Sequence, residues 1–287
     1  MIYRFICSKI TGGLLLAALT VLAPAPVIAD GPVVSTGFGV EFASGKYGTD
    51  TRTDSLYMPV TLAVSTERLG FSLEIPYLYQ SSSAVNTGIF TGAGGQMMRA
   101  QKRAAAMTGS MGAGSMTSAT GAGSGVSQSG LGDIIARGGY VLVPEGDYMP
   151  RIRPYLQVKF PTGDESEALG TGTFAEGGAV ELSKQIGDWY SFAEAGYVFQ
   201  GKSTLLALKD YLSYDAGLGH SIGENFLPML VVKGSTAPIA GSSDLFEVRL
   251  KLKYLATTHT GFEGYRAKGI TTDSPDYGSG VAVFHEF

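Results

Sequence analysis

Period-two alternation of apolar and charged residues is the feature of this sequence that most restricts its fold. The clearest example is the segment 246–254, in which an apolar or aromatic residue occupies every even position. The odd positions carry the charged residues Glu247, Arg249, Lys251 and Lys253. Successive side chains of a β-strand point to opposite faces of the sheet. The segment is therefore predicted to be a strand with one apolar and one charged face.

Similar alternation predicts twelve strands in all. They span residues 34–44, 54–65, 69–80, 130–143, 151–161, 175–185, 189–200, 209–221, 225–234, 244–255, 259–269 and 277–287. In three of these segments, polar and apolar residues do not separate onto opposite faces: 189–200, 225–234 and 259–269. The alternation therefore also admits ten or fourteen strands.

Alternation fits a soluble sandwich, with its apolar face in the core, as well as a membrane barrel, with its apolar face toward lipid. Charged residues make up only 16% of the chain, against about 25% in soluble domains. Connections after even-numbered strands are short, such as 67–68 and 223–225, whereas those after odd-numbered strands are longer and rich in Gly, Ser, Thr and Asp. This asymmetry predicts an all-β fold: a transmembrane antiparallel up-and-down β-barrel of about 12 strands with one long extracellular loop. Both chain ends would face the periplasm.

The first 29 residues have the pattern of a secretory signal peptide. Arg4 and Lys9 precede a short apolar core, and Val27-Ile28-Ala29 precedes the expected cleavage site. A retained anchor helix is the alternative, but the apolar core is too short for it. We expect a cleaved signal peptide at 1–29, a barrel at 30–287, and a location in the outer membrane of a Gram-negative bacterium. Removal of the signal takes away two of the 21 bases and none of the 25 acids. The acidic balance that remains argues against a nucleic-acid partner.

The chain ends in an aromatic residue on an alternating strand. Phe287 follows Tyr277, Ser279, Val281, Val283 and His285 at alternate positions. This resembles the C-terminal signature of outer-membrane barrels. We therefore expect Phe287 to act as an assembly signal for the barrel-assembly machinery.

Residues 81–130 form a long insertion rich in Gly, Ser and Met, without an acidic residue. Within it, 96–107 combines helix-forming residues with the positive charges of Arg99, Lys102 and Arg103. We interpret these three residues as a candidate lid, either folded into the lumen or held against anionic lipopolysaccharide. A disordered surface loop is the alternative. The methionines also admit copper(I) binding, but methionine is equally an apolar filler.

The predicted register places fourteen charged side chains in the lumen. The acids are Glu41, Glu74, Asp133, Glu181, Glu194, Asp215, Glu247 and Glu263. The bases are Arg137, Arg153, Lys159, Arg249, Lys251 and Lys253. Mixed signs predict neutralised pairs in a wet interior, without strong ion selectivity. Pairs that only brace the barrel are the alternative.

Candidates for catalysis are few. His220, His259 and His285 map to the periplasmic end, and the usual hydrolase, zinc and nucleotide motifs are absent from the sequence. The acidic segment 163–167 lacks calcium-loop spacing and is interpreted as a solvated outer loop. We expect no enzyme activity, no catalytic residue, no metal and no cofactor.

Four segments, in this serial order, carry a resemblance to a known family. They are Ser129-Gly130-Leu131-Gly132-Asp133, Lys159-Phe160-Pro161-Thr162-Gly163-Asp164, Glu194-Ala195-Gly196-Tyr197 and Ser274-Pro275-Asp276-Tyr277-Gly278. Over roughly 34–287 the chain resembles the MetA-pathway phenol-degradation family, outer-membrane transporters found beside aromatic-degradation genes. The resemblance implies a barrel and the uptake of small hydrophobic or aromatic compounds.

The sequence thus predicts an outer-membrane channel or uptake porin for small, apolar or aromatic solutes, working by passive diffusion. Its expected partners are outer-membrane lipid, lipopolysaccharide and a small-molecule solute. The alternative is a structural or surface-interaction barrel with a closed lumen and a partner-binding loop.

Overall fold

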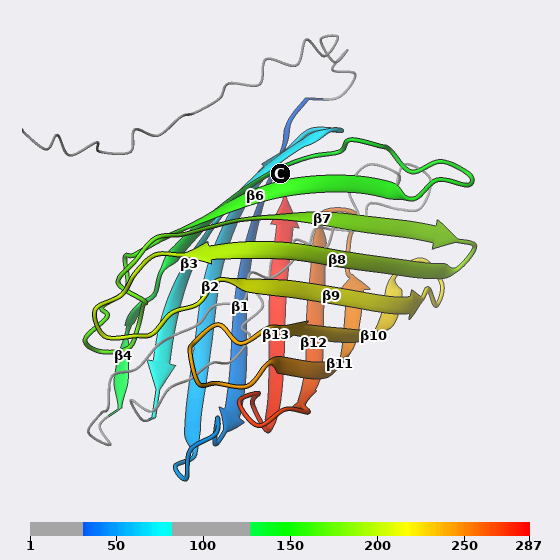
Figure 1. Ribbon diagram of the computed structural model, residues 1–287. Helices are drawn as coiled ribbons and strands as arrows, with labels where there is room; N and C mark the ends of the chain where they lie inside the picture. Colours follow the sequence, from blue (N-terminus) through cyan, green and yellow to red (C-terminus); the bar gives the residue numbers. More distant parts are fainter. Residues whose placement is uncertain (1–30, 82–126) are drawn as a thin grey trace, which may run out of the picture.

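The computed structural model describes residues 31–81 and 127–287, and in these residues the strands form one antiparallel sheet (Figure 1). The strands are β1 (Val33–Gly45), β2 (Thr53–Ser65), β3 (Leu69–Gln80), β4 (Gln128–Leu131), β5 (Ile134–Tyr140), β6 (Arg151–Phe160), β7 (Ala175–Ile186), β8 (Trp189–Gln200), β9 (Tyr211–His220), β10 (Phe226–Ser235), β11 (Leu245–Leu255), β12 (Thr260–Gly269) and β13 (Tyr277–Glu286). Among these residues no helix is long and apolar enough to cross a membrane.

The sheet closes on itself. Each strand from β5 to β13 pairs with its sequence neighbour, β13 pairs with β1, and β3 pairs with both β2 and β5. The short strand β4 pairs only with the end of β3 and lies outside the ring. The prediction of a twelve-stranded antiparallel barrel is therefore confirmed.

The one predicted strand that the structure breaks is 130–143. It divides into β4 and β5 at Gly132–Asp133, where both segments still pair with β3. The Gly132 amide donates to the Pro76 carbonyl at 2.9 Å, so the interruption is an ordered feature of the wall. The interruption removes Asp133 from the strand pairing and turns its side chain toward the connection 161–174 at the loop end.

The two ends of the barrel differ as expected. At one end the connections 66–68, 187–188, 221–225 and 256–259 are short. The connection 141–150 is the exception there, because the bridge between Val143 and Ile152 continues its hairpin. We call this the turn end; the first and last strands begin and finish at it, with β13 beside β1 (Figure 1). The opposite, loop end carries the long connections 81–127 and 161–174.

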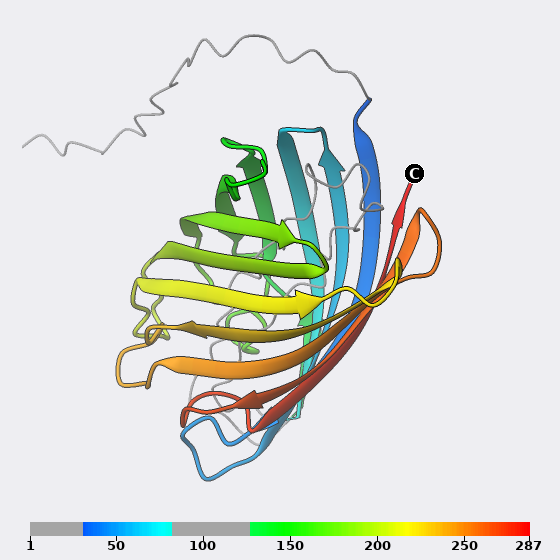
Figure 2. The same ribbon diagram turned by 90° about the vertical axis from the view of Figure 1, so that its right-hand side faces the viewer.

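The two faces of the wall have opposite chemistry. Large apolar side chains at alternate positions point outward and remain exposed, as Leu156, Leu250 and Val281 do. Aromatic rings gather on the outer face at the turn end, where Phe226 stacks on Tyr254 at 4.6 Å between centroids. An apolar outer band with aromatic residues at its edge is the arrangement of a barrel that spans a bilayer. The strands β6–β9 cross β1–β3 at a large angle, so the wall is strongly curved (Figure 2).

Candidate functional site

The candidate site is the charged interior of the barrel. Eleven of the fourteen predicted lumen residues are buried: Glu41, Glu74, Asp133, Arg137, Arg153, Lys159, Glu181, Glu194, Glu247, Arg249 and Glu263. Asp215, Lys251 and Lys253 are partly buried. The structure thus gathers these residues inside the wall, because odd and even positions of each strand face opposite sides.

Acids and bases inside the barrel form ion pairs across neighbouring strands. Arg137 contacts Glu74 at 3.2 Å between Nη1 and Oε2. Lys251 contacts Glu263 at 2.5 Å between Nζ and Oε1, with Lys253 at 3.9 Å from the other carboxylate oxygen. Charges removed from water require such partners, since an isolated buried charge costs several kcal/mol.

Six charged residues occupy paired positions on six consecutive strands, β6 to β11. This charged row consists of Arg153, Glu181, Glu194, Asp215, Lys233 and Glu247. Its ends are closed by further bases, Arg151 at 3.5 Å from Glu181 and Arg249 in contact with Glu247. The row runs around about half of the barrel; three acids, Glu181, Glu194 and Asp215, lie next to one another in it, with bases on both sides.

Two members of this site escaped the sequence analysis. Lys233 lies on β10, where it is the one charged residue and, besides Ser235 at the strand end, both faces are apolar, so that polarity could not assign it to a face. Arg151 is the first residue of β6 and of the predicted strand 151–161; its alternation with Arg153 was a signal for an inward position that the sequence analysis did not use. Both are nevertheless buried in the interior.

Tyrosine hydroxyls complete the hydrogen bonding of the buried carboxylates. Tyr265 donates to Glu41 at 2.6 Å and Tyr155 donates to Glu194 at 2.7 Å. Tyr57 donates to Glu74, which also accepts from Arg137. The inward positions of these tyrosines are consistent with the period-two register, but the sequence analysis did not single them out, and their partners lie on other strands. Neutral donors allow the interior to hold carboxylates without adding further cations.

Apolar clusters flank the charges within the interior. At the turn end the cluster consists of Tyr190, Phe192, Leu227, Met229 and Val231. Toward the loop end another consists of Ala43, Tyr57, Leu78, Ile135 and Leu169. The interior therefore combines neutralised charges with aromatic and aliphatic surfaces.

The connection 161–174 folds over the mouth at the loop end. Asp133 holds it by accepting from the amides of Gly163 and Thr171, each at 3.0 Å. Lys159 contacts the same carboxylate at 2.7 Å. Leu169, carried inward on this connection, is 3% exposed. We call the Asp133–Lys159–Thr171 contacts the latch; they join two of the segments that carry the family resemblance.

The acidic part of that connection lies at the surface, with Asp164 and Glu167 exposed. Hydrogen bonds from the Ser166 hydroxyl and amide lower the pKa of Asp164. In the connection between β1 and β2, Tyr47 is buried, and this burial raises the pKa of its phenol. Both groups are thus fixed in one protonation state near neutral pH.

The remaining predicted residues lie away from this site. Arg99, Lys102 and Arg103 fall outside the described residues, as do the predicted signal peptide and the loop methionines. Phe287 is exposed, and its amide donates to the Val34 carbonyl at 2.9 Å. His220, His259 and His285 lie at or near the turn end. In 31–81 and 127–287 no group of His, Cys, Asp and Glu is arranged to hold a metal ion.

A closed barrel with an apolar outer band and an occupied interior belongs to the class of outer-membrane channel folds. The solved structure of an outer membrane channel from Pseudomonas putida F1 aligns with 93% of this chain and 100% of its own, at 11% identity and a TM-score of 0.63. The β domain of the Bordetella autotransporter BrkA aligns at 10% identity and 0.47, covering 90% and 100% of the two chains. The toluene transporter TodX of Pseudomonas putida aligns at 9% identity and 0.40, covering 90% and 89%.

The chain belongs to the family described as "Putative MetA-pathway of phenol degradation", which matches residues 25–287. The resemblance seen in the sequence is thereby confirmed. The likeness to the Pseudomonas putida F1 channel is one of fold, because the sequences share few residues. No curated protein matches the sequence significantly.

Proposed function

We propose that this protein is a passive channel of the outer membrane that admits small, neutral, apolar or aromatic solutes, and that it is not an enzyme. The observation that carries the proposal is the composition of the interior, in which charges are neutralised in pairs beside aromatic and aliphatic clusters. Neutralised pairs create no ring of one sign that would attract a particular ion. The aromatic and aliphatic side chains offer dispersion contacts to uncharged solutes.

Two further features support the proposal. The apolar outer band matches a bilayer, and the long connections at the loop end match the extracellular side of outer-membrane barrels. The description of the family refers to phenol degradation, for which an aromatic compound must first enter the cell.

A closed structural barrel is the second candidate, because the interior charges are almost inaccessible to water. Glu74 and Glu181 are 2% and 1% exposed, whereas side chains lining an open aqueous pore are wetted. In this conformation the latch holds the 161–174 connection inward at the loop end, where it would narrow a channel. The two candidates differ in whether the latch opens.

Measurements of conductance distinguish the passive channel from the closed structural barrel. In a planar bilayer, the double variant Asp133→Asn with Lys159→Met removes the ion pair of the latch and should raise the fraction of time spent open. Lys184→Gln is the matched control, because Lys184 pairs with Glu145 at the turn end, at the opposite end of β7 from the mouth. A deletion strain complemented with the latch variant should take up phenol faster than one complemented with the wild type or the control. The complemented strains should take up benzoate, an anion of similar size, more slowly than phenol. Absence of conductance and uptake in all of them would favour the closed structural barrel.

A further inference from the structure

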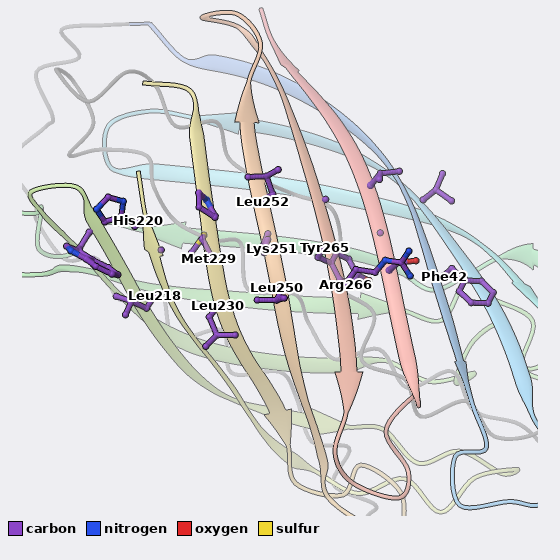
Figure 3. A pocket seen from close by; sticks show the side chains of 18 residues that line it. Phe42, Leu218, His220, Met229, Leu230, Leu250, Lys251, Leu252, Tyr265 and Arg266 are labelled. Carbon is purple, nitrogen blue, oxygen red and sulfur yellow. The ribbon is translucent and has the colours of Figure 1, made fainter. Parts of the chain in front are cut away.

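A groove on the outer face of the barrel is separate from the interior site. It crosses β8 to β13 and β1, with a cavity volume of about 1010 Å³. Its walls include the outward side chains of Phe42, Leu218, Leu230, Leu250 and Val281. Figure 3 shows Leu218, Leu230, Leu250 and Arg266 in one band across successive strands. The volume falls at the upper end of ligand pockets, about 300–1,000 Å³.

Glycine forms part of the groove floor. Gly264 occupies an outward position on β12, between Leu252 and Val281 of the neighbouring strands. A Cβ there would lie 3.6 Å from the Gly280 carbonyl oxygen and 4.0 Å from Val281 Cγ1, which is ordinary contact. The space over Gly264 is thus open on the side that faces the bilayer, and an acyl chain is the material present there to fill it.

One guanidinium interrupts the apolar wall of this groove. Arg266 is exposed on the outer face of β12, between Leu250 of β11 and Ser279 of β13. Among the described strands the other outward-facing charges, Asp54, Glu176, Lys184 and Lys268, lie within two residues of a strand end. Arg266 has no ion pair or hydrogen bond with any described residue. A charge facing hydrocarbon without a partner is costly, by about 2–4 kcal/mol at mid-membrane.

A second cation lies near Arg266. Lys268 follows Arg266 on the same face of β12, about 7 Å further along the strand toward the loop end. The outward positions of β11 and β13 carry no acid that could neutralise either residue. Arg266 lies three residues, about 10 Å of strand, below the end of β12, so both cations occupy the loop-end half of the wall.

From this geometry we infer that the groove binds lipopolysaccharide through a phosphate of lipid A, with an acyl chain lying over Gly264. The guanidinium of Arg266 matches a phosphate with two parallel hydrogen bonds, and Lys268 adds a point charge at the rim. The inference rests on the outer-membrane location proposed above, with the loop end outward, because lipid A occupies the outer leaflet. It does not depend on the interior being a channel.

The test measures lipid A retained per barrel by mass spectrometry after extraction from outer membranes in mild detergent. Arg266→Gln should lower retention about tenfold, because a charge-assisted contact is lost. Arg266→Lys should give an intermediate value, since the charge remains without the planar fork. Gly264→Leu should also lower retention by filling the groove, while both cations remain. Lys184→Gln is the matched control, since it removes an outer-face cation at the turn end and should leave retention unchanged.

Unchanged retention in Arg266→Gln and Gly264→Leu, in protein that still runs as a folded barrel, would overturn the inference. Retention of phosphatidylglycerol in place of lipid A would overturn it as well. Solute flux measured on the same preparations separates this site from the proposed function. If the wild type shows no solute flux while lipid A retention in the variants follows the expected order, the channel is refuted and the lipid site stands.

Discussion

The inner and outer faces of β11 present opposite environments only one residue apart along the chain. Glu247 and Arg249 point inward and are 1% and 4% exposed, whereas Leu250, on the outer face, is 67% exposed. The inner residues can be charged because each has a partner inside the wall: Arg249 contacts Glu247 on the same strand, and its guanidinium lies 4.5 Å from the ring centroid of Tyr265 on β12. The outer residues are apolar because lipid supplies no hydrogen-bond partner. In this barrel, therefore, the buried side chains of the inner face are polar and the exposed side chains of the outer face are apolar.

Removal of a shared carboxylate from the inner face should have the largest effect on stability. Glu181 contacts both Arg151 and Arg153 at 3.5 Å, so Glu181→Ala leaves two buried guanidinium groups without their common partner. We expect a loss of about 3–5 kcal/mol in the free energy of unfolding, measured by urea titration in lipid vesicles. The same change at the exposed Glu224 is the control and should cost less than about 0.5 kcal/mol. Equal losses at both positions would mean that the inner pairs do not brace the barrel.

A charge added to the outer face should have the next largest effect. Val60 lies near the middle of β2 with its side chain outward, so Val60→Arg should cost about 2–4 kcal/mol in the same assay. Val64→Arg, near the turn end of β2, should cost about 0–1 kcal/mol because the side chain reaches the interface. A cost that did not vary with depth would contradict the membrane span.

Loss of one neutral donor inside the wall should have a smaller effect. Tyr265→Phe removes the hydroxyl that donates to the buried Glu41 at 2.6 Å, and we expect a loss of about 1.5–3 kcal/mol. Tyr148→Phe, at an exposed position, is the matched control and should leave the free energy of unfolding unchanged. If both variants unfold at the same urea concentration as the wild type, the tyrosine does not stabilise the interior carboxylate.

Loss of one partner from a redundant pair should have the smallest effect. Lys251→Gln leaves Lys253 to neutralise Glu263, and the Lys251 side chain is already 20% exposed. The expected loss is about 1 kcal/mol or less, comparable with a surface ion pair. A loss as large as that of Glu181→Ala would show that Lys253 does not compensate.

Most of the wall could be predicted from the sequence, because the period-two pattern is local and identifies strands by adjacent residues. The strand 69–80 was predicted with the bounds the structure gives, and the inward side of β11 followed from its four charged residues. The division of 130–143 at Asp133 could not be predicted. It depends on contacts between Asp133 and Gly163, Lys159 and Thr171, which are distant in the chain.

By itself, the sequence determined which face of each strand carries the charges, since this follows from the alternation of neighbouring residues along one strand. The low charged fraction and the asymmetry of the connections then indicated a barrel with that face inward. The tertiary structure decided which charges meet. It placed Lys233 between Asp215 and Glu247, joined the latch, and set Arg266 within an outer groove. The physical reason is that partners across a sheet, and the curvature that hollows its outer face, depend on closure of the whole barrel and on no single segment.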